Sequence, residues 1–188
     1  MNNPKATIRP STHDAIVAAA LELFNANANT SMSEIAVRAG VGRATLHRHF
    51  RTRDDLVRAM GEQALAATET AVKTIDSPHT PSLERLRHMF EAVIPLGAQY
   101  AFLSTEHIAD EQLRARYAEQ LNWVHDLVSA LHDEGVLASD FPASWAVAQI
   151  DQLIWVGWRE VSAGRLAMAD APDLAVRTLI NGLGGTTR

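Results

Sequence analysis

Apolar residues recur along this chain at the three- and four-residue spacing of amphipathic helices, and no useful stretch alternates with the period of a strand. The first stripe consists of Ile16, Ala19, Ala20, Leu23 and Phe24. It predicts a helix that opens with Ser11 and Asp14 placed like a capping box. Residues 25–29 are rich in Asn, which favours turns, so the helix is expected to end there.

Three more helices are predicted close behind the first. Ser31 and Glu34 have the spacing of a second capping box, and the short helix that they start ends near Gly40. A third helix is expected at about 43–49. A fourth begins at Asp54-Asp55, whose charge suits the positive end of a helix dipole, and runs to about residue 74.

The remaining sequence is also helical in pattern. Residues 77–81, with two prolines, form the clearest linker, and the domain boundary is expected there or just before it. Pro95 with Gly97 should end or kink the helix that contains them. The further helices are predicted at roughly 82–98, 101–108, 110–134, 142–163 and 171–183. The chain is therefore predicted to be all-α, with about nine helices and no internal repeat.

The second and third predicted helices have the spacing of a helix-turn-helix. Ala36 is small enough for a crossing helix to approach closely, and Gly40 suits the positive φ that the turn requires. Leu46 and Phe50 share one inward side of the third helix. We therefore expect a helix-turn-helix domain over 1–58 and a second helical domain over 59–188.

Charge is unevenly distributed along the 188 residues, whose net charge is −5. Residues 1–60 carry +3 and residues 61–188 carry −8. A basic segment on an acidic body is typical of a polyanion-binding head, although a solvated charged face is an equally good reading of the charge alone. The chain has no Cys, which excludes thiol catalysis, thiolate metal sites and disulfides. No apolar run is long enough to span a membrane, and a cytoplasmic protein is expected.

Residues 32–56 resemble the DNA-binding domain of TetR-family transcriptional regulators. The residues that match the family pattern are Ile35, Ala36, Ala39, Gly40, Val41, Thr45, Leu46, His49, Phe50 and Leu56. Arg53 and Asp54 keep the charges of the family's usual Lys and Glu. Three positions depart from the pattern: Gly42 stands for the usual Ser, Ala44 for a frequent Gly and His47 for the usual Tyr.

The resemblance implies a homodimeric regulator, most often a repressor, whose third helix enters the major groove of a palindromic operator. The residues expected to contact double-stranded DNA are Ser31, Ser33, Arg43, Ala44, Thr45, His47, Arg48, His49 and Arg53. By analogy with the family, Arg43 and Ala44 lie near base edges, and Thr45, His47 and Arg53 contact phosphates. His49 is equally consistent with packing on the core of its own domain.

Two late segments are expected to form the dimer interface. Residues 142–163 are apolar almost all round, so the helix must be buried on more than one side. Residues 171–183 add a further apolar stripe. Two helices from each subunit would form a four-helix interface, as in dimers of this family. A fully internal helix in a monomer is the alternative.

A small apolar or amphipathic effector of unknown identity is expected to bind the second domain and release the DNA. The bulky residues in the helices that line the family's cavity are Phe90, Ile94, Phe102, Trp123, Leu127, Trp155 and Trp158. Polar groups could come from His88, Gln99, His107, Asn122, His125 or Gln152. Each of these residues also fits an ordinary place in the core or on the surface.

An enzyme is the first rival class, and the sequence gives it little support. It contains no HExxH, P-loop or GxSxG motif, and its pairs of neighbouring His and acidic residues are typical of solvated helix faces. No catalytic residue, metal site or cofactor is expected. The second rival is a helical small-molecule-binding protein without DNA-binding activity, against which the basic helix-turn-helix surface argues.

Overall fold

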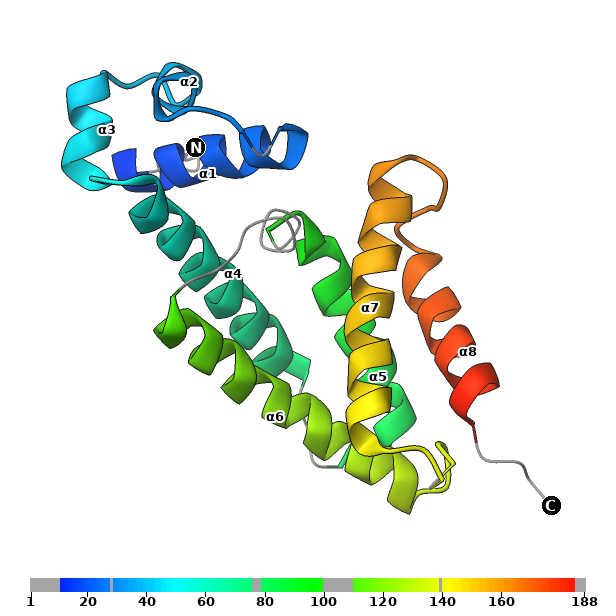
Figure 1. Cartoon of the computed structure of the whole chain (residues 1–188). Helices are drawn as coiled ribbons and strands as arrows, with labels where there is room; N and C mark the ends of the chain where they lie inside the picture. Colours follow the sequence, from blue (N-terminus) through cyan, green and yellow to red (C-terminus); the bar gives the residue numbers. More distant parts are fainter. Residues whose placement is uncertain (1–10, 28, 76–78, 100–109, 139, 185–188) are drawn as a thin grey trace, which may run out of the picture. The chain divides into compact units, whose positions relative to one another are not determined.

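The computed structural model describes residues 11–27, 29–75, 79–99, 110–138 and 140–184. In these ranges it contains eight α-helices, one 3₁₀ helix and no strand, which confirms the all-α fold (Figure 1). The elements are α1 (Thr12–Ala26), α2 (Met32–Arg38), α3 (Arg43–His49), α4 (Arg53–Ile75), α5 (Ser82–Val93), η1 (Ile94–Gln99), α6 (Glu111–Asp133), α7 (Ala143–Ser162) and α8 (Ala171–Leu183). The helix predicted at 101–108 lies outside the described residues. No described helix is long and apolar enough to cross a membrane.

The chain divides into two compact units, Met1–Met60 and Gly61–Arg188, with the division inside α4. The first unit is a three-helix head completed by the start of α4. Its core includes Ile16, Phe24, Ile35, Leu46 and Phe50, each at most 3 % exposed. The inward positions predicted for Leu46 and Phe50 are therefore confirmed.

Local signals set the helix boundaries of the first unit. The Ser11 hydroxyl accepts a hydrogen bond from the Asp14 backbone at 3.1 Å and caps α1. Ser31 and Glu34 form the predicted capping box at the start of α2. Gly40 follows α2 with a φ of 68°, and Val41 N–H donates back to the Ala36 carbonyl. This left-handed turn reverses the chain between α2 and α3.

The second unit is built around a core shared by α5, α6, α7 and α8. Its largest fully buried side chains include Leu86, Phe90, Ile94, Leu127 and Leu131. A long-range cap fixes the start of α5: the Ser82 hydroxyl donates to the Glu134 carboxylate at 2.7 Å, and the Ser82 backbone N–H donates to the same carboxylate. This bond spans 52 residues, so no local sequence signal announces it.

The segment predicted as one helix over 82–98 is not α-helical throughout. The α-helix ends at Val93 and is followed by the 3₁₀ helix η1, consistent with the break expected from Pro95. Gly97 is buried in η1, and a Cβ built there would lie 2.3 Å from Trp158 Cγ. Only glycine therefore lets η1 pack this closely on α7.

Gly61 is a second glycine whose role only packing explains. It lies within α4, where glycine costs about 1 kcal/mol relative to alanine. A Cβ at this position would lie 2.4 Å from Leu113 Cδ2 of α6. The glycine therefore allows α6 to approach α4 closely.

Candidate nucleic-acid interface

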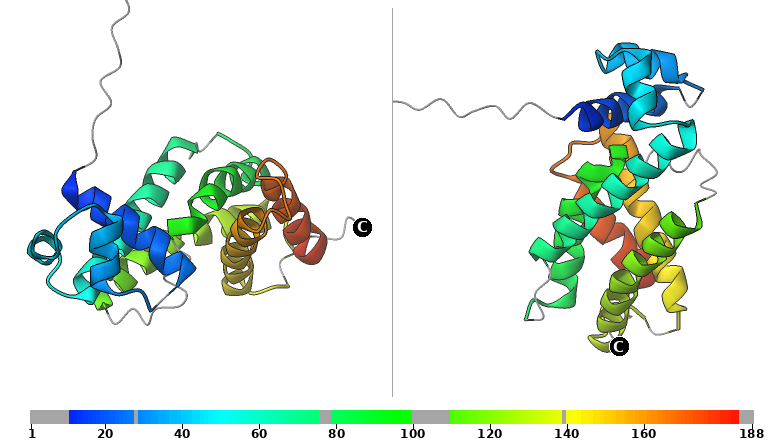
Figure 2. Two further views of the ribbon diagram at one scale, coloured as in Figure 1. Left: turned by 90° about the horizontal axis from the view of Figure 1, so that it is seen from above. Right: turned by 90° about the vertical axis from the view of Figure 1, so that its left-hand side faces the viewer.

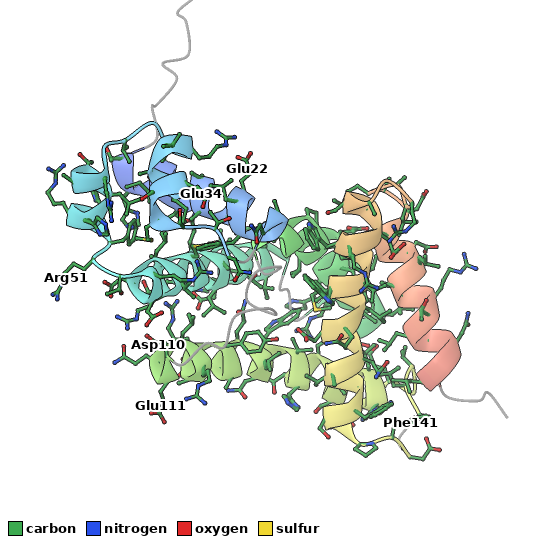
Figure 3. The ribbon with its side chains drawn as sticks, turned by 45° about the horizontal axis from the view of Figure 1, so that its top comes forward. Glu22, Glu34, Arg51, Asp110, Glu111 and Phe141 are labelled. Carbon is green, nitrogen blue, oxygen red and sulfur yellow. The ribbon has the colours of Figure 1, made fainter. Side chains whose placement is uncertain are left out.

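The outer side of α3 carries the exposed polar residues that the sequence predicted. Arg43, Ala44 and Arg48 are exposed, and Thr45 and His47 are half-buried. Arg43 and Arg48 make no hydrogen bond or ion pair with any part of the chain that the structure describes. Figure 3 shows Arg51, just past α3, extending away from the ribbon. These cationic groups are available to bind phosphates or base edges.

The first turn of α3 lacks a side-chain cap. Gly42 occupies the N-cap position in an extended conformation and makes no side-chain hydrogen bond. The departure from the usual Ser at this position therefore leaves the N-terminal amides of α3 without a hydroxyl acceptor from the chain.

Ser31 and Ser33, at the start of α2, differ in what they can offer a ligand. The Ser31 hydroxyl donates to the Glu34 carboxylate at 2.7 Å and accepts from the Glu34 N–H. Bonds from the Ser31 backbone and side chain lower the pKa of the Glu34 carboxyl. The Ser31 hydroxyl proton is thus already used within the capping box. Ser33 is exposed, and no intramolecular bond occupies its hydroxyl among the described residues.

Arg53 is held within the head. Its Nη1 donates to the Thr30 carbonyl at 3.0 Å, and its guanidinium carbon lies 4.1 Å from the centre of the Phe24 ring. Arg53 therefore ties the first turn of α4 to α1 and to the loop before α2. Contact with a phosphate would use the donors of the guanidinium fork that these interactions leave.

His49 lies beside two other rings. Its centroid is 6.3 Å from that of His13, in an edge-on arrangement, and 6.4 Å from that of Phe50. His13 in turn lies 4.9 Å from Phe50. The His49 side chain is nevertheless exposed, so these ring contacts leave its polar edge open to solvent.

A further cap at the start of α4 escaped the sequence reasoning. The Asp55 N–H donates to the Thr52 hydroxyl at 3.1 Å, and the Thr52 N–H donates to the Asp55 carboxylate at 3.0 Å. These bonds lower the pKa of the Asp55 carboxyl, with a smaller contribution from the charges of Arg58 and Arg51. The Thr-x-x-Asp spacing was a sufficient signal for this reciprocal cap.

The predicted effector-pocket residues fall into two groups. Phe90, Ile94 and Leu127 are fully buried in the core of the second unit. Trp155 and Trp158 are half-buried on α7 and stack with ring centroids 5.3 Å apart. Phe102 lies outside the described residues.

The polar residues suggested for this pocket are mostly on the surface. Asn122 and Gln152 are exposed, and His88 and His125 are half-buried. The sequence reasoning missed Gln120, whose two side-chain amide atoms are buried without a hydrogen-bond partner among the described residues. Gln120 lies between Leu113 and Leu127 on the inward stripe of α6, and this polar residue in an apolar stripe was the available signal. The Trp123 indole N–H, one turn further on, is also buried without a partner.

The segments predicted for dimerisation pair within one chain and leave apolar side chains exposed. Helices α7 and α8 lie side by side in both views of Figure 2. On α7, Ala146, Val147 and Ile150 are buried, whereas Trp145 is 54 % exposed and Val156 is 38 % exposed. On α8, Leu174 is 47 % exposed. A single chain therefore covers only one side of each helix.

No group of three or more His, Asp or Glu within the described ranges could hold a metal ion. The acidic residues whose pKa values are clearly shifted are Asp14, Glu34, Asp55 and Glu160, and all four shifts are downward. Such shifts stabilise the charged form and have structural causes in caps and in the ion pair of Glu160 with Arg165. They do not resemble a carboxyl kept protonated for acid catalysis.

Comparison with known proteins places these features in context. Residues 16–60 match the model of bacterial regulatory proteins of the tetR family. The chain is 28% identical over 160 residues to the HTH-type transcriptional repressor LfrR of Mycolicibacterium smegmatis, covering 83% of this chain and 82% of that protein.

Solved structures extend the similarity to the fold of the whole chain. The TetR-like regulator LfrR from Mycobacterium smegmatis, in complex with proflavine, superposes with a TM-score of 0.79 at 25% identity, over 92% of this chain and 96% of that one. AibR in complex with isovaleryl coenzyme A and operator DNA superposes with a TM-score of 0.76 at 19% identity, over 90% of this chain and 98% of that one. These proteins are regulators rather than enzymes.

Proposed function

Residues 16–60 belong to the TetR family of bacterial regulatory proteins, and on that premise we propose that the protein is a ligand-responsive transcriptional repressor. The observation that carries the proposal is the outer face of α3, where Arg43 and Arg48 are exposed and have no partner within the described chain. Unpaired cations on a helix-turn-helix recognition helix fit the phosphates and base edges of a major groove. The similarity to the repressor LfrR supports the same function.

The individual contacts follow from exposure and chemistry. Arg43 and Ala44, in the first turn of α3, are assigned to base edges, and Thr45, His47 and Arg48 to the backbone. Ser33, His49 and Arg53 supply further phosphate contacts, Arg53 while it also holds the head together. Ser31 contributes mainly through the backbone at the start of α2, because Glu34 occupies its hydroxyl.

The operator is a palindrome read by a homodimer. Exposed Trp145 and Val156 on α7 and Leu174 on α8 support an interface formed by these two helices, over 142–163 and 171–183. Two symmetry-related heads then read half-sites about 34 Å apart, one helical turn of DNA, or a larger whole number of turns apart. A protein that acts on the genome in this way works in the cytoplasm.

A small molecule bound in the second unit lowers the affinity for DNA. Two observations support an effector site there: the stacked Trp155–Trp158 pair and the unsatisfied amide of Gln120. The related LfrR structure contains proflavine. An effector that binds the DNA-free arrangement more tightly shifts the population toward it and releases the operator.

Selection of bound sequences from a random duplex pool tests the proposal. We expect a palindromic consensus bound in mobility-shift assays by two chains for each half-site pair. Arg43→Ala should cost about 1–3 kcal/mol on the consensus and relax preference at one base pair. Arg48→Ala should instead weaken all duplexes alike.

Arg114→Ala is the matched control, since it removes an exposed charge from α6 in the second unit. It should leave DNA binding unchanged. If no duplex is bound at low salt, the regulator function is refuted. The molecule would then be a helical small-molecule-binding protein.

A further inference from the structure

We infer that the effector is a planar aromatic cation, recognised between α6 and α7 by the Asp151 carboxylate, the stacked indoles of Trp155 and Trp158, and the Gln120 amide. The inference deepens the proposed function and depends on it only for the word effector, because the binding site stands on contacts within the second unit. Asp151, Tyr117 and Gln120 were not among the residues that the sequence pointed to.

Asp151 carries a negative charge that no described cation neutralises. It is half-buried on α7, and its carboxylate accepts a hydrogen bond from the Tyr117 hydroxyl of α6 at 2.8 Å. Other acids of this unit have arginine partners: the pairs are Glu160 with Arg165, Asp173 with Arg87, and Glu69 with Arg116. A partly desolvated carboxylate without such a partner attracts a cation from solution.

The two indoles lie next to this carboxylate on the same side of α7. Asp151, Trp155 and Trp158 follow one another at i, i+4 and i+7, which places them on one helix face. The indole planes are inclined by only 18°, so they present nearly parallel flat surfaces. Trp158 is held in place by the close approach of Gly97. Indole is the aromatic side chain that binds cations best, and its flat face favours a planar ligand.

Gln120 provides the independent sign that a polar ligand belongs here. It lies on the inward stripe of α6, three residues after Tyr117, so it is within one turn of the bond to Asp151. Its amide nitrogen and oxygen are both inaccessible and unbonded. Leaving such a group unsatisfied is costly, and a ligand that carries an N–H or an acceptor nitrogen would satisfy it.

The combination distinguishes between classes of effector. A carboxylate beside flat aromatic faces favours a delocalised cation such as an aminoacridinium. An anionic effector, such as an acyl thioester carrying phosphates, would be repelled by Asp151. A neutral apolar molecule would leave both Asp151 and Gln120 without a bond.

Fluorescence titration of the full-length protein with proflavine, in the absence of DNA, tests this inference. DNA is left out because acridines also bind duplexes. We expect saturable binding that Asp151→Asn weakens by about tenfold or more, since it removes the charge but keeps the shape. Tyr117→Phe should change affinity much less, because it removes only the hydroxyl and leaves the carboxylate charged.

Asp126→Asn is the matched control, because it removes an exposed acid on the outer side of α6 and changes the net charge equally. It should bind proflavine like the wild type. Pyrenesulfonate, a planar anion, should bind weakly, and Asp151→Asn should improve its binding. Equal proflavine affinity in the Asp151→Asn and wild-type proteins, or tighter binding of the anion by the wild type, would overturn the inference.

Gln120→Leu separates a ligand-binding role from a structural one. Replacing the unsatisfied amide by an apolar group should raise the thermal unfolding midpoint and weaken proflavine binding in the same variant. Greater stability with unchanged affinity would remove Gln120 from the site. Because DNA binding is measured separately, failure of the cation to bind leaves the repressor proposal intact, and failure to bind DNA leaves the cation site intact.

Discussion

The two units of this chain are stabilised in different ways. In the first unit, helix boundaries rest on contacts three or four residues apart, such as Ser31 with Glu34 and Thr52 with Asp55. In the second unit, the decisive contacts join distant segments: Glu134 caps Ser82, Gly97 packs on Trp158 and Tyr117 bonds Asp151.

The polar groups of the two units also differ. In the head, the buried side of α3 is apolar and its polar residues face outward. In the second unit, Gln120 and Trp123 keep polar atoms buried without partners. The comparison indicates that the head is built to present a fixed surface, whereas the second unit retains unsatisfied groups that a ligand can use.

The largest effect is expected from Gly97→Ala in the second unit. The new methyl group would lie within 3 Å of three atoms of Trp158, including its Cβ, so a backbone or ring must move. We expect a loss of about 3 kcal/mol in the free energy of unfolding of this unit. Hydrogen exchange should quicken in α5 and α7 and stay unchanged in α2 and α3. Faster exchange throughout both units would contradict the independence of the head.

Arg53→Ala is expected to have the next largest effect, this time in the head. It removes a charged hydrogen bond to the Thr30 carbonyl and a cation–π contact with Phe24, together worth about 2 kcal/mol. Exchange should quicken in α1 and α2. Arg51→Ala, on an exposed neighbouring position, is the control and should leave stability nearly unchanged. If the two variants were equally stable, the structural role of Arg53 would be refuted.

Acid should weaken the head through its caps. Hydrogen bonds from Ser31 lower the pKa of Glu34 in the folded protein below its usual value of 4.5. The resulting stabilisation is therefore fully present above that value and is lost as the pH falls through the folded pKa. We expect exchange in α2 to quicken between about pH 5 and pH 3. Glu34→Gln keeps an acceptor for the Ser31 N–H and should reduce this dependence; an unchanged profile would exclude Glu34 as its source.

The smallest effect is expected from Gly42→Ser at the start of α3. The backbone there is already extended, and a Cβ would meet nothing within 4 Å. The serine hydroxyl should cap α3 and stabilise the head by a few tenths of a kcal/mol, about the difference between Gly and Ser at an N-cap. Thermal unfolding measures this gain, with Gly42→Ala as the control that adds the Cβ without the hydroxyl. A stability no higher than that of Gly42→Ala would show that the hydroxyl does not cap the helix.

Sequence alone was enough to predict the three helices of the head, their caps and the inward residues of α3. Those features depend on hydrogen bonds and side-chain spacing within a few residues, which can be read along the chain. The same local pattern carried the family resemblance, which the comparison with tetR-family proteins confirms. The assignment of individual DNA and effector contacts stays a prediction.

Only the tertiary structure showed that Arg53 is engaged within the head, that Gly61 and Gly97 permit close helix packing, and that Asp151 meets Tyr117 across two helices. It also showed that α5 gives way to a 3₁₀ helix at Ile94. The physical reason is the range of the interactions. A cap is decided by its neighbours in the sequence, whereas the surroundings of a glycine or a lone carboxylate are decided by segments that folding brings together.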